Sequence, residues 1–401
     1  MDQRFGLFIH WGPVSLRGTE IAWSRGHEVP TAEYDSLYKE FNPALFNADA
    51  WAKAAKDAGM KYLVIVAKHH DGFCLWPTKI SGYNIMNTPF KKDVVGELAT
   101  ACKRYDLKFG IYFTVMDWHD PHYGSHNGVP QTDSLTNMAE FVRTMKSELK
   151  ELVTNYHPFL LWFDGNWEKP WKNEYATDVY SYLKALDPNL IINNRLGAGN
   201  DHLNLTPNSI GDYATPEQVI GALNMHMPWE TCMTICNQWA WKANDKMKSL
   251  KECVQTLAKT AGGNGNLLFN VGPMPDGRIE QRQVTRLQEI GNWLKINGES
   301  IYGTKGGPFA PNNDFATTRK GNKLYIHIFN RKQDTLTLPL ITTAKVKQAY
   351  FLNGAKIKYS QSASGSISIA LPDQLPDSND AVITIELNTS AEAIPVVSYW
   401  N

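Results

Sequence analysis

The sequence predicts an α/β protein: a (β/α)8-type barrel, regular or distorted, followed by a small all-β sandwich. Three observations predict it. Short apolar runs alternate with helical segments over roughly 300 residues, and about eight of these runs look like buried strands. After Gly307 the helical pattern stops and only short β-prone stretches follow. The strand candidates are residues 5–10, 62–67, 109–115, 159–163, 190–192 and 266–271, with weaker candidates at 210–213 and 231–235.

Segments with apolar residues at helical spacing separate these runs. In residues 48–58, for example, Ala48, Trp51, Ala54, Ala55 and Ala58 fall at helical spacing. The other helix candidates are residues 94–105, 134–156, 174–186, 245–261 and 279–297. An open doubly wound sheet is the alternative fold. Such a sheet typically has a glycine-rich phosphate-binding loop after the first strand, and His10-Trp11-Gly12-Pro13 does not match that loop.

The C-terminal region has only β-prone stretches, separated by turn residues such as Asn353-Gly354 and Ser364-Gly365. These stretches are residues 323–329, 335–340, 346–352, 366–371 and 381–387. Residues 302–313, rich in Gly and Pro, predict the linker. We therefore expect a catalytic barrel over residues 1–305 and a β-sandwich over residues 306–401.

Composition narrows the function. The 40 basic and 40 acidic residues cancel without charge blocks, so no nucleic-acid partner is expected. No apolar run reaches the roughly 18 residues of a membrane span. No cysteine or histidine spacing matches a metal site, so we expect no metal and no cofactor. The first strand begins almost at Met1, which leads us to expect a removed leader and a periplasmic, secreted or lysosome-like compartment.

Polar and aromatic residues follow the strand candidates repeatedly, which stability alone does not explain, because burying such groups without partners is costly. In a parallel barrel the active site lies where strands end. The strand ends are His10-Trp11, Lys68-His69-His70-Asp71, Met116-Asp117-Trp118-His119, Trp162-Phe163-Asp164-Gly165 and Asn193-Asn194-Arg195. Asp164 stands out, since Gly165 lets the chain turn away and a carboxylate at a barrel mouth can act as nucleophile, base or metal ligand.

Acid/base chemistry at a sugar needs a second carboxylate. The candidates are Asp71, Asp117, Asp212, Glu217 and Glu230. Glu230 opens a strand candidate, and Glu217 follows Thr215-Pro216, where it could be a first-turn helix acid without a catalytic role. The residues alone do not choose among these five.

Several motifs in order resemble the α-L-fucosidases of glycoside hydrolase family 29, from about residue 4 to about residue 300, and the β-rich tail fits that family's C-terminal domain. The matching segments are Phe5-Gly-Leu-Phe-Ile-His-Trp-Gly12, Lys68-His-His-Asp-Gly-Phe73, Trp162-Phe-Asp-Gly165, Trp229-Glu-Thr-Cys-Met-Thr-Ile235 and Gly263-Asn-Gly-Asn-Leu-Leu-Phe-Asn-Val-Gly-Pro273.

The resemblance implies a retaining exo-α-L-fucosidase that acts on terminal fucosyl linkages of fucosylated glycans by double displacement. It implies Asp164 as the nucleophile and, in the broad-specificity branch of the family, Glu230 as the acid/base. It implies a fucose pocket lined by His10, His69, His70, Trp162 and Arg195, to which we add Trp23 and Tyr112. These residue types suit a deoxy sugar, since neutral imidazole both donates and accepts hydrogen bonds and Trp offers an apolar face.

Alternatives remain at this stage. The same site could take an α-L-galactoside or a related α-L-glycoside, and a non-catalytic glycan-binding relative is a different class, although two retained carboxylates argue against it. His69, His70 and Asp71 could be metal ligands. The sequence differs from the family's usual motifs in three segments: Ala22-Trp23-Ser24, Gln238-Trp239-Ala240-Trp241 and Tyr112-Phe113-Thr114. These differences leave open the aglycone preference and whether Tyr112 or Phe113 faces the sugar.

Overall fold

Seven parallel strands form one sheet in the computed structural model, which describes residues 2–126, 129–130, 135–199, 202–338 and 344–397. Their order is β7 (Ile191–Ile192), β6 (Leu160–Asp164), β3 (Lys108–Thr114), β2 (Tyr62–Lys68), β1 (Phe5–Ile9), β9 (Asn266–Val271) and β8 (Glu230–Thr234). Six of these strands match the main strand candidates to within a residue or two at each end, and β8 matches the weaker candidate 231–235.

An extended segment closes the ring between β7 and β8. Three isolated parallel bridges hold it, pairing Asn193 with Tyr213, Ala214 with Trp229 and Glu217 with Cys232. Residues 213–217 therefore occupy the sixth of eight positions around the ring without forming a regular strand. The described residues between β7 and β8 contain no α-helix, only the 3-10 turn η4 (Asn194–Leu196). The structure thus confirms a distorted (β/α)8-type barrel.

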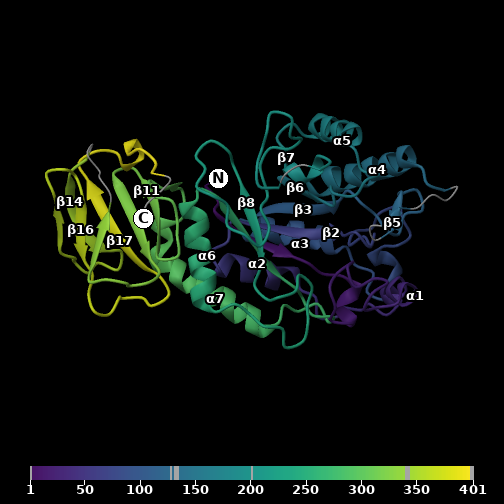
Figure 1. Cartoon of the computed structure of the whole chain (residues 1–401). Helices are drawn as coiled ribbons and strands as arrows, with labels where there is room; N and C mark the ends of the chain where they lie inside the picture. The colour runs from purple at the N-terminus through teal and green to yellow at the C-terminus, as the bar shows by residue number, and fades with distance from the viewer. Residues whose placement is uncertain (1, 127–128, 131–134, 200–201, 339–343, 398–401) are drawn as a thin grey trace.

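Helices cover the outside of the ring (Figure 1). They are α2 (Ala48–Asp57), α3 (Val94–Arg104), α4 (Met138–Tyr156), α5 (Asn173–Leu186), α6 (Leu250–Gly262) and α7 (Gln281–Asn297), with the short α1 (Thr31–Tyr34) in the β1–β2 connection. Two begin later than predicted because their caps lie further along. Ser249 and Glu252 form a capping box before α6, and the Asn137 side chain accepts the N–H of Glu140 at the start of α4. Residue 134, the predicted start of α4, lies outside the described residues.

Side-chain alternation along the strands separates two apolar clusters. In β6, Leu161 and Phe163 face the helices, whereas Leu160 and Trp162 face the barrel interior. Asp164 therefore shares the inward face of β6. The interior cluster comprises Phe8, Tyr62, Val64, Val66, Tyr112, Leu160, Trp162, Tyr213, Cys232 and Leu268.

The C-terminal region consists of antiparallel sheets, as predicted. One has the order β10 (Lys305–Gly306), β11 (Phe315–Lys320), β12 (Lys323–Ile328), β17 (Ala381–Leu387) and β14 (Val346–Phe351); the other has the order β13 (Thr335–Leu338), β16 (Ile367–Ala370) and β15 (Tyr359–Gln361). A small hairpin, β4 (Ser125–His126) and β5 (Val129–Pro130), belongs to the barrel loops. Helix α6 lies between the sandwich and the barrel (Figure 1). The domain division after residue 305 stays a prediction.

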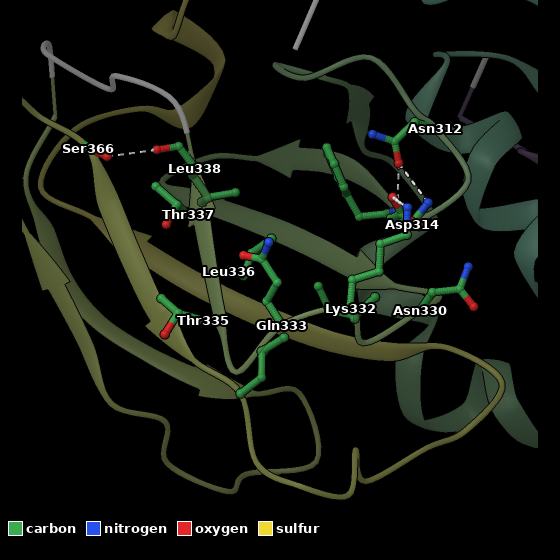
Figure 2. A pocket seen from close by; sticks show the side chains of 13 residues that line it. Asn312, Asp314, Asn330, Lys332, Gln333, Thr335, Leu336, Thr337, Leu338 and Ser366 are labelled. Carbon is green, nitrogen blue, oxygen red and sulfur yellow. Dashed lines mark hydrogen bonds and ion pairs between the residues drawn. The ribbon is translucent and has the colours of Figure 1, made fainter. Parts of the chain in front are cut away.

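A cavity of about 570 Å³ opens in this sandwich (Figure 2). Lys332 and Asp314 form an ion pair of 2.7 Å at its wall, and the Asn312 side chain accepts the N–H of Asp314 at 2.8 Å. No residue expected in the active site lines this cavity. Among the described residues, no helix is both long and apolar enough to cross a bilayer.

Candidate active site

Asp164 is the last residue of β6 and lies at the end of the barrel where active sites of this fold occur. One of its carboxylate oxygens accepts a hydrogen bond from Arg195 Nη1 at 2.8 Å. The other accepts the hydroxyl of Tyr112 at 3.1 Å and lies 3.7 Å from His70 Nε2. Burial alone disfavours the ionised form, but Arg195 and then His70 outweigh it and lower the pKa of Asp164. The carboxylate is therefore held ionised, as a nucleophile requires.

Arg195 holds two carboxylates with one nitrogen. Its Nη1 donates to Asp164 Oδ1 at 2.8 Å and to Glu217 Oε2 at 2.8 Å. The two oxygens can thus be no further apart than twice this distance, which includes the separation of about 5–5.5 Å that retaining glycosidases need. Thr215 fixes the guanidinium, since its hydroxyl accepts from Nε and its carbonyl from Nη2, both at 3.0 Å.

Glu217 is not in a helix. It ends the extended segment that replaces the sixth strand, where Thr215 binds Arg195 and Glu217 pairs with Cys232 of β8. Its side chain is 38% exposed, against 12% for Asp164. Glu217 therefore combines proximity to Asp164 with access to solvent.

Glu230 is the first residue of β8 and lies at the opposite end of the barrel from Asp164. It lines a cavity of about 560 Å³ together with the first residues of five other strands: Tyr62, Lys108, Leu160, Ile191 and Asn266. Burial raises the pKa of Glu230 to about 7, partly offset by hydrogen bonds from Tyr62, Trp162 and Tyr213. The structure does not bring the expected acid/base next to the nucleophile, because the Trp229-Glu230 motif begins a strand instead of ending one.

The three histidines lie together at the catalytic end. The rings of His10 and His69 are 5.8 Å apart, and those of His69 and His70 are 4.1 Å apart. Burial lowers the pKa of His10 and of His70 to about 4, and that of His69 well below its usual value. All three are therefore neutral near pH 7 and can both donate and accept hydrogen bonds.

Hydrogen bonds orient these imidazoles. His10 Nδ1 lies 2.6 Å from Asn270 Oδ1, while the Asn270 amide donates to the carbonyl of Trp239 at 2.8 Å. Since the amide oxygen can only accept, His10 Nδ1 carries the proton and Nε2 is left to accept one from a ligand. His69 Nδ1 is buried and has no hydrogen-bond partner among the described residues, so a bound hydroxyl would satisfy it.

Both adjacent histidines reach the site because β2 ends irregularly. The register between β2 and β3 shifts between Val66 and Lys68, and the strand ends at Lys68. Lys68 turns away from the interior and forms buried ion pairs with Asp117 at 2.7 Å and Glu148 at 2.8 Å. Beyond the strand, His69 stacks on Tyr112 and His70 approaches Asp164.

Tyr112, and not Phe113, faces the site. Tyr112 belongs to the interior cluster, donates to Asp164 and stacks on Trp162 with ring centroids 5.6 Å apart. Phe113 packs in the outer cluster with Phe163. Trp162 in turn has the Arg195 guanidinium 4.8 Å from its ring centroid. Tyr112 and Phe113 point to opposite faces of β3 because successive side chains alternate along a strand.

A pair of exposed tryptophans flanks His70. Trp23 is 42% exposed and stacks on Trp167, 46% exposed, at 6.3 Å, and both rings lie within 6 Å of that of His70. Trp167 was not among the predicted residues, although its place three positions after Asp164 could have suggested it. Trp11, by contrast, is buried in the core.

Glu20 is a second residue that sequence reasoning missed. Its carboxylate accepts the backbone N–H groups of Trp239 at 2.9 Å and Ala240 at 3.0 Å. It thereby links the chain just before residues 22–24 to residues 238–241, two segments whose sequences differ from the family pattern.

Asp71 does not join the histidines as a metal ligand. Its carboxylate accepts the Tyr34 hydroxyl at 2.6 Å and the N–H of Phe73 at 3.3 Å. Within the described ranges, no group of three or more His, Cys, Asp or Glu side chains is arranged to hold a metal ion.

A barrel that places an ionised Asp, a nearby Glu and a cluster of neutral His at the ends of its strands defines the class of retaining glycoside hydrolases. The sequence model of the α-L-fucosidase family matches residues 1–299. The chain belongs to the α-L-fucosidase family.

Solved structures and curated relatives agree. α-L-Fucosidase isoenzyme 1 from Paenibacillus thiaminolyticus is 34% identical with a TM-score of 0.86, and the match covers 96% of this chain and 97% of that one. A trapped covalent intermediate of a family 29 α-L-fucosidase from Bacteroides thetaiotaomicron is 29% identical with a TM-score of 0.88, covering 97% and 95%. Human tissue α-L-fucosidase is 30% identical over 94% of this chain and 85% of its own. The protein is a retaining α-L-fucosidase, and the α-L-galactosidase and non-catalytic alternatives are not favoured.

Proposed function

We propose that Asp164 is the nucleophile and Glu217 the acid/base of this fucosidase, in place of Glu230. The observation that carries this proposal is the single Arg195 nitrogen shared by Asp164 and Glu217 at 2.8 Å each. It keeps the two carboxylate oxygens within twice that distance of each other, a range that includes the separation at which retaining glycosidases work. Glu230, at the other end of the strands, has no such relation to Asp164.

In the first step Asp164 attacks the anomeric carbon while Glu217 protonates the departing glycosidic oxygen, giving a β-fucosyl ester on Asp164 and the free leaving group. Ester formation removes the negative charge of Asp164 and leaves Glu217 as the carboxyl group bound to Arg195. In the second step Glu217 takes a proton from water, the water oxygen attacks the anomeric carbon, and Asp164 is released with α-L-fucose. The greater exposure of Glu217 suits both leaving-group departure and water entry.

The remaining predicted residues form the fucose pocket in this proposal. His10, His69 and His70 bind ring hydroxyls as neutral donors and acceptors. Tyr112 and Arg195 hold the Asp164 carboxylate, and Trp162, only 1% exposed, forms the floor of the pocket behind them. The exposed Trp23 supplies apolar surface for the sugar ring and its methyl group.

Mechanism-based trapping tests the nucleophile. A 2-deoxy-2-fluoro-α-L-fucosyl fluoride should label the enzyme with one fluorofucosyl group, because the electron-withdrawing fluorine slows ester hydrolysis. Mass spectrometry of the digested protein should place the label on the peptide that contains Asp164. A label on a peptide without Asp164 would contradict the assignment, and the Glu217→Gln variant should still accept the label from this activated fluoride.

We also propose the broad-specificity branch of the family, with fucosylated oligosaccharides and glycoconjugates as substrates. A panel of aryl α-L-fucosides and oligosaccharides with different fucosyl linkages tests this breadth. Hydrolysis of the aryl fucoside and of several linkages is expected, whereas cleavage of one branched linkage alone would contradict it. An aryl α-L-galactoside serves as the control sugar.

For the compartment, we propose a periplasmic, secreted or lysosome-like location. The similarity to tissue and plasma α-L-fucosidases supports it. Fractionation of the source cells tests it, and activity confined to the cytosol would contradict it.

A further inference from the structure

Glu230 is a buried carboxylate that binds only neutral donors. Its Oε1 accepts the indole N–H of Trp162 at 3.1 Å and the Tyr213 hydroxyl at 3.4 Å, and its Oε2 accepts the Tyr62 hydroxyl. Only 4% of the residue is exposed, and it forms no ion pair among the residues that the structure describes. Loss of this side chain would leave three buried donors unpaired, so the position requires a hydrogen-bond acceptor and not a charge.

The donors of Glu230 come from three separate parts of the ring. Tyr62 begins β2, Trp162 lies in β6, and Tyr213 begins the extended segment that ends at Glu217. One carboxylate thus ties the nucleophile strand to the segment that carries Glu217. These two stretches have no regular strand pairing with each other, because β7 lies between them.

Trp162 transmits this constraint to the catalytic end. Its indole is fixed at Nε1 by Glu230, stacks on Tyr112 and lies under the guanidinium of Arg195. Arg195 and Tyr112 are the two donors to Asp164, and Arg195 also binds Glu217. A rotation of the indole would displace the groups that hold both carboxylates.

We propose that Glu230 is a positioning residue, which holds the Trp162 indole from below and, through Trp162 and Arg195, keeps Asp164 and Glu217 at their working separation. This role rests on the catalytic roles proposed for Asp164 and Glu217. In this proposal the glutamate of the Trp229-Glu230 motif positions Trp162 and does not donate a proton to the leaving group.

A leaving-group series combined with a double-mutant cycle tests the role. Glu230→Leu removes the acceptor for Trp162, and we expect kcat/KM to fall roughly tenfold to a hundredfold, since small misplacement of catalytic groups costs on the order of 10². The fall should extend to activated leaving groups as well as poor ones, because displacement of Arg195 misplaces the nucleophile Asp164 together with Glu217. Trp162→Phe removes the N–H, and the double variant should lose little more than Trp162→Phe alone.

Glu230→Gln and Tyr62→Phe keep the test informative if Glu230→Leu does not fold. Glutamine keeps an acceptor for Trp162 and should recover most of the activity. Loss of the Tyr62 hydroxyl should give a smaller fall, which also extends to activated leaving groups. Asp380→Asn is the matched control: this buried carboxylate binds His327 in the sandwich at 2.7 Å, so its loss should lower stability without changing kcat/KM.

Two results would overturn the role. A loss in Glu230→Gln confined to poor leaving groups, with azide yielding α-L-fucosyl azide, would make Glu230 the acid/base. Fully additive losses of Glu230→Leu and Trp162→Phe would show that Glu230 does not act through Trp162. Failure of the catalytic proposal itself is separate, since it would appear as leaving-group-independent losses in the Glu217 variants.

Discussion

Replacing Asp164 with glycine should lower kcat on an aryl α-L-fucoside by on the order of 10⁴ or more, the scale expected when a nucleophile is lost. The loss should be chemical and not structural, because the partners of Asp164 keep other contacts. Arg195 still binds Glu217 and Thr215, and His70 Nδ1 still lies 2.6 Å from Thr114 Oγ1. Circular dichroism and thermal unfolding should therefore show a folded protein.

Sodium azide should partly restore turnover of an activated substrate in this variant. The small anion can enter the space left by the carboxylate, beside Arg195 and Tyr112, and attack the anomeric carbon from the same face. The product should be β-L-fucosyl azide, the inverted anomer, which proton NMR distinguishes from the α anomer. Activity within tenfold of the wild type, or rescue that gives only α-L-fucosyl azide, would contradict the assignment of Asp164.

The architecture and the position of Asp164 could be predicted because both depend on local sequence. Apolar runs marked the strands and their ends marked the catalytic edge, so Asp164, His10 and Arg195 were expected there, whereas their roles came from the family resemblance and stay predictions. The alternation of side chains also shows that Tyr112 faces the interior and Phe113 the helices, once the pairing of Tyr112 with Trp162 is known.

Glu217, the acid/base that we propose, could not be predicted in this way. Residues 213–217 contain Pro216 and make only isolated bridges, so no strand pattern marks their position in the ring. From the sequence alone, Glu217 after Thr215-Pro216 resembles an acidic residue in the first turn of a helix. Glu230 opens a strand candidate in the sequence, and the structure places it at the opposite end of the barrel from Asp164.

The Glu217 variants give the second large effect. Glu217→Ala should lower kcat/KM by roughly 10² to 10⁴ for a phenyl α-L-fucoside or an oligosaccharide, because these leaving groups need protonation. A dinitrophenyl fucoside leaves without a proton, so its first step should be almost unchanged and the fucosyl ester should accumulate, seen as a burst of released phenolate. Glu217→Gln keeps an acceptor for Arg195 and should show the same split, which separates lost proton transfer from lost positioning.

With azide, the Glu217 variants should give the opposite anomer of fucosyl azide from that expected for Asp164→Gly. With Asp164 present, the β-fucosyl ester forms first and azide displaces it from the other face, so the product should be α-L-fucosyl azide. Glu230→Gln should give no fucosyl azide under the same conditions, because its acid/base is intact. Equal losses of the Glu217 variants on phenyl and dinitrophenyl fucosides would remove Glu217 from proton transfer. The anomer formed by each variant thus assigns each carboxylate by the face of the sugar from which it acts.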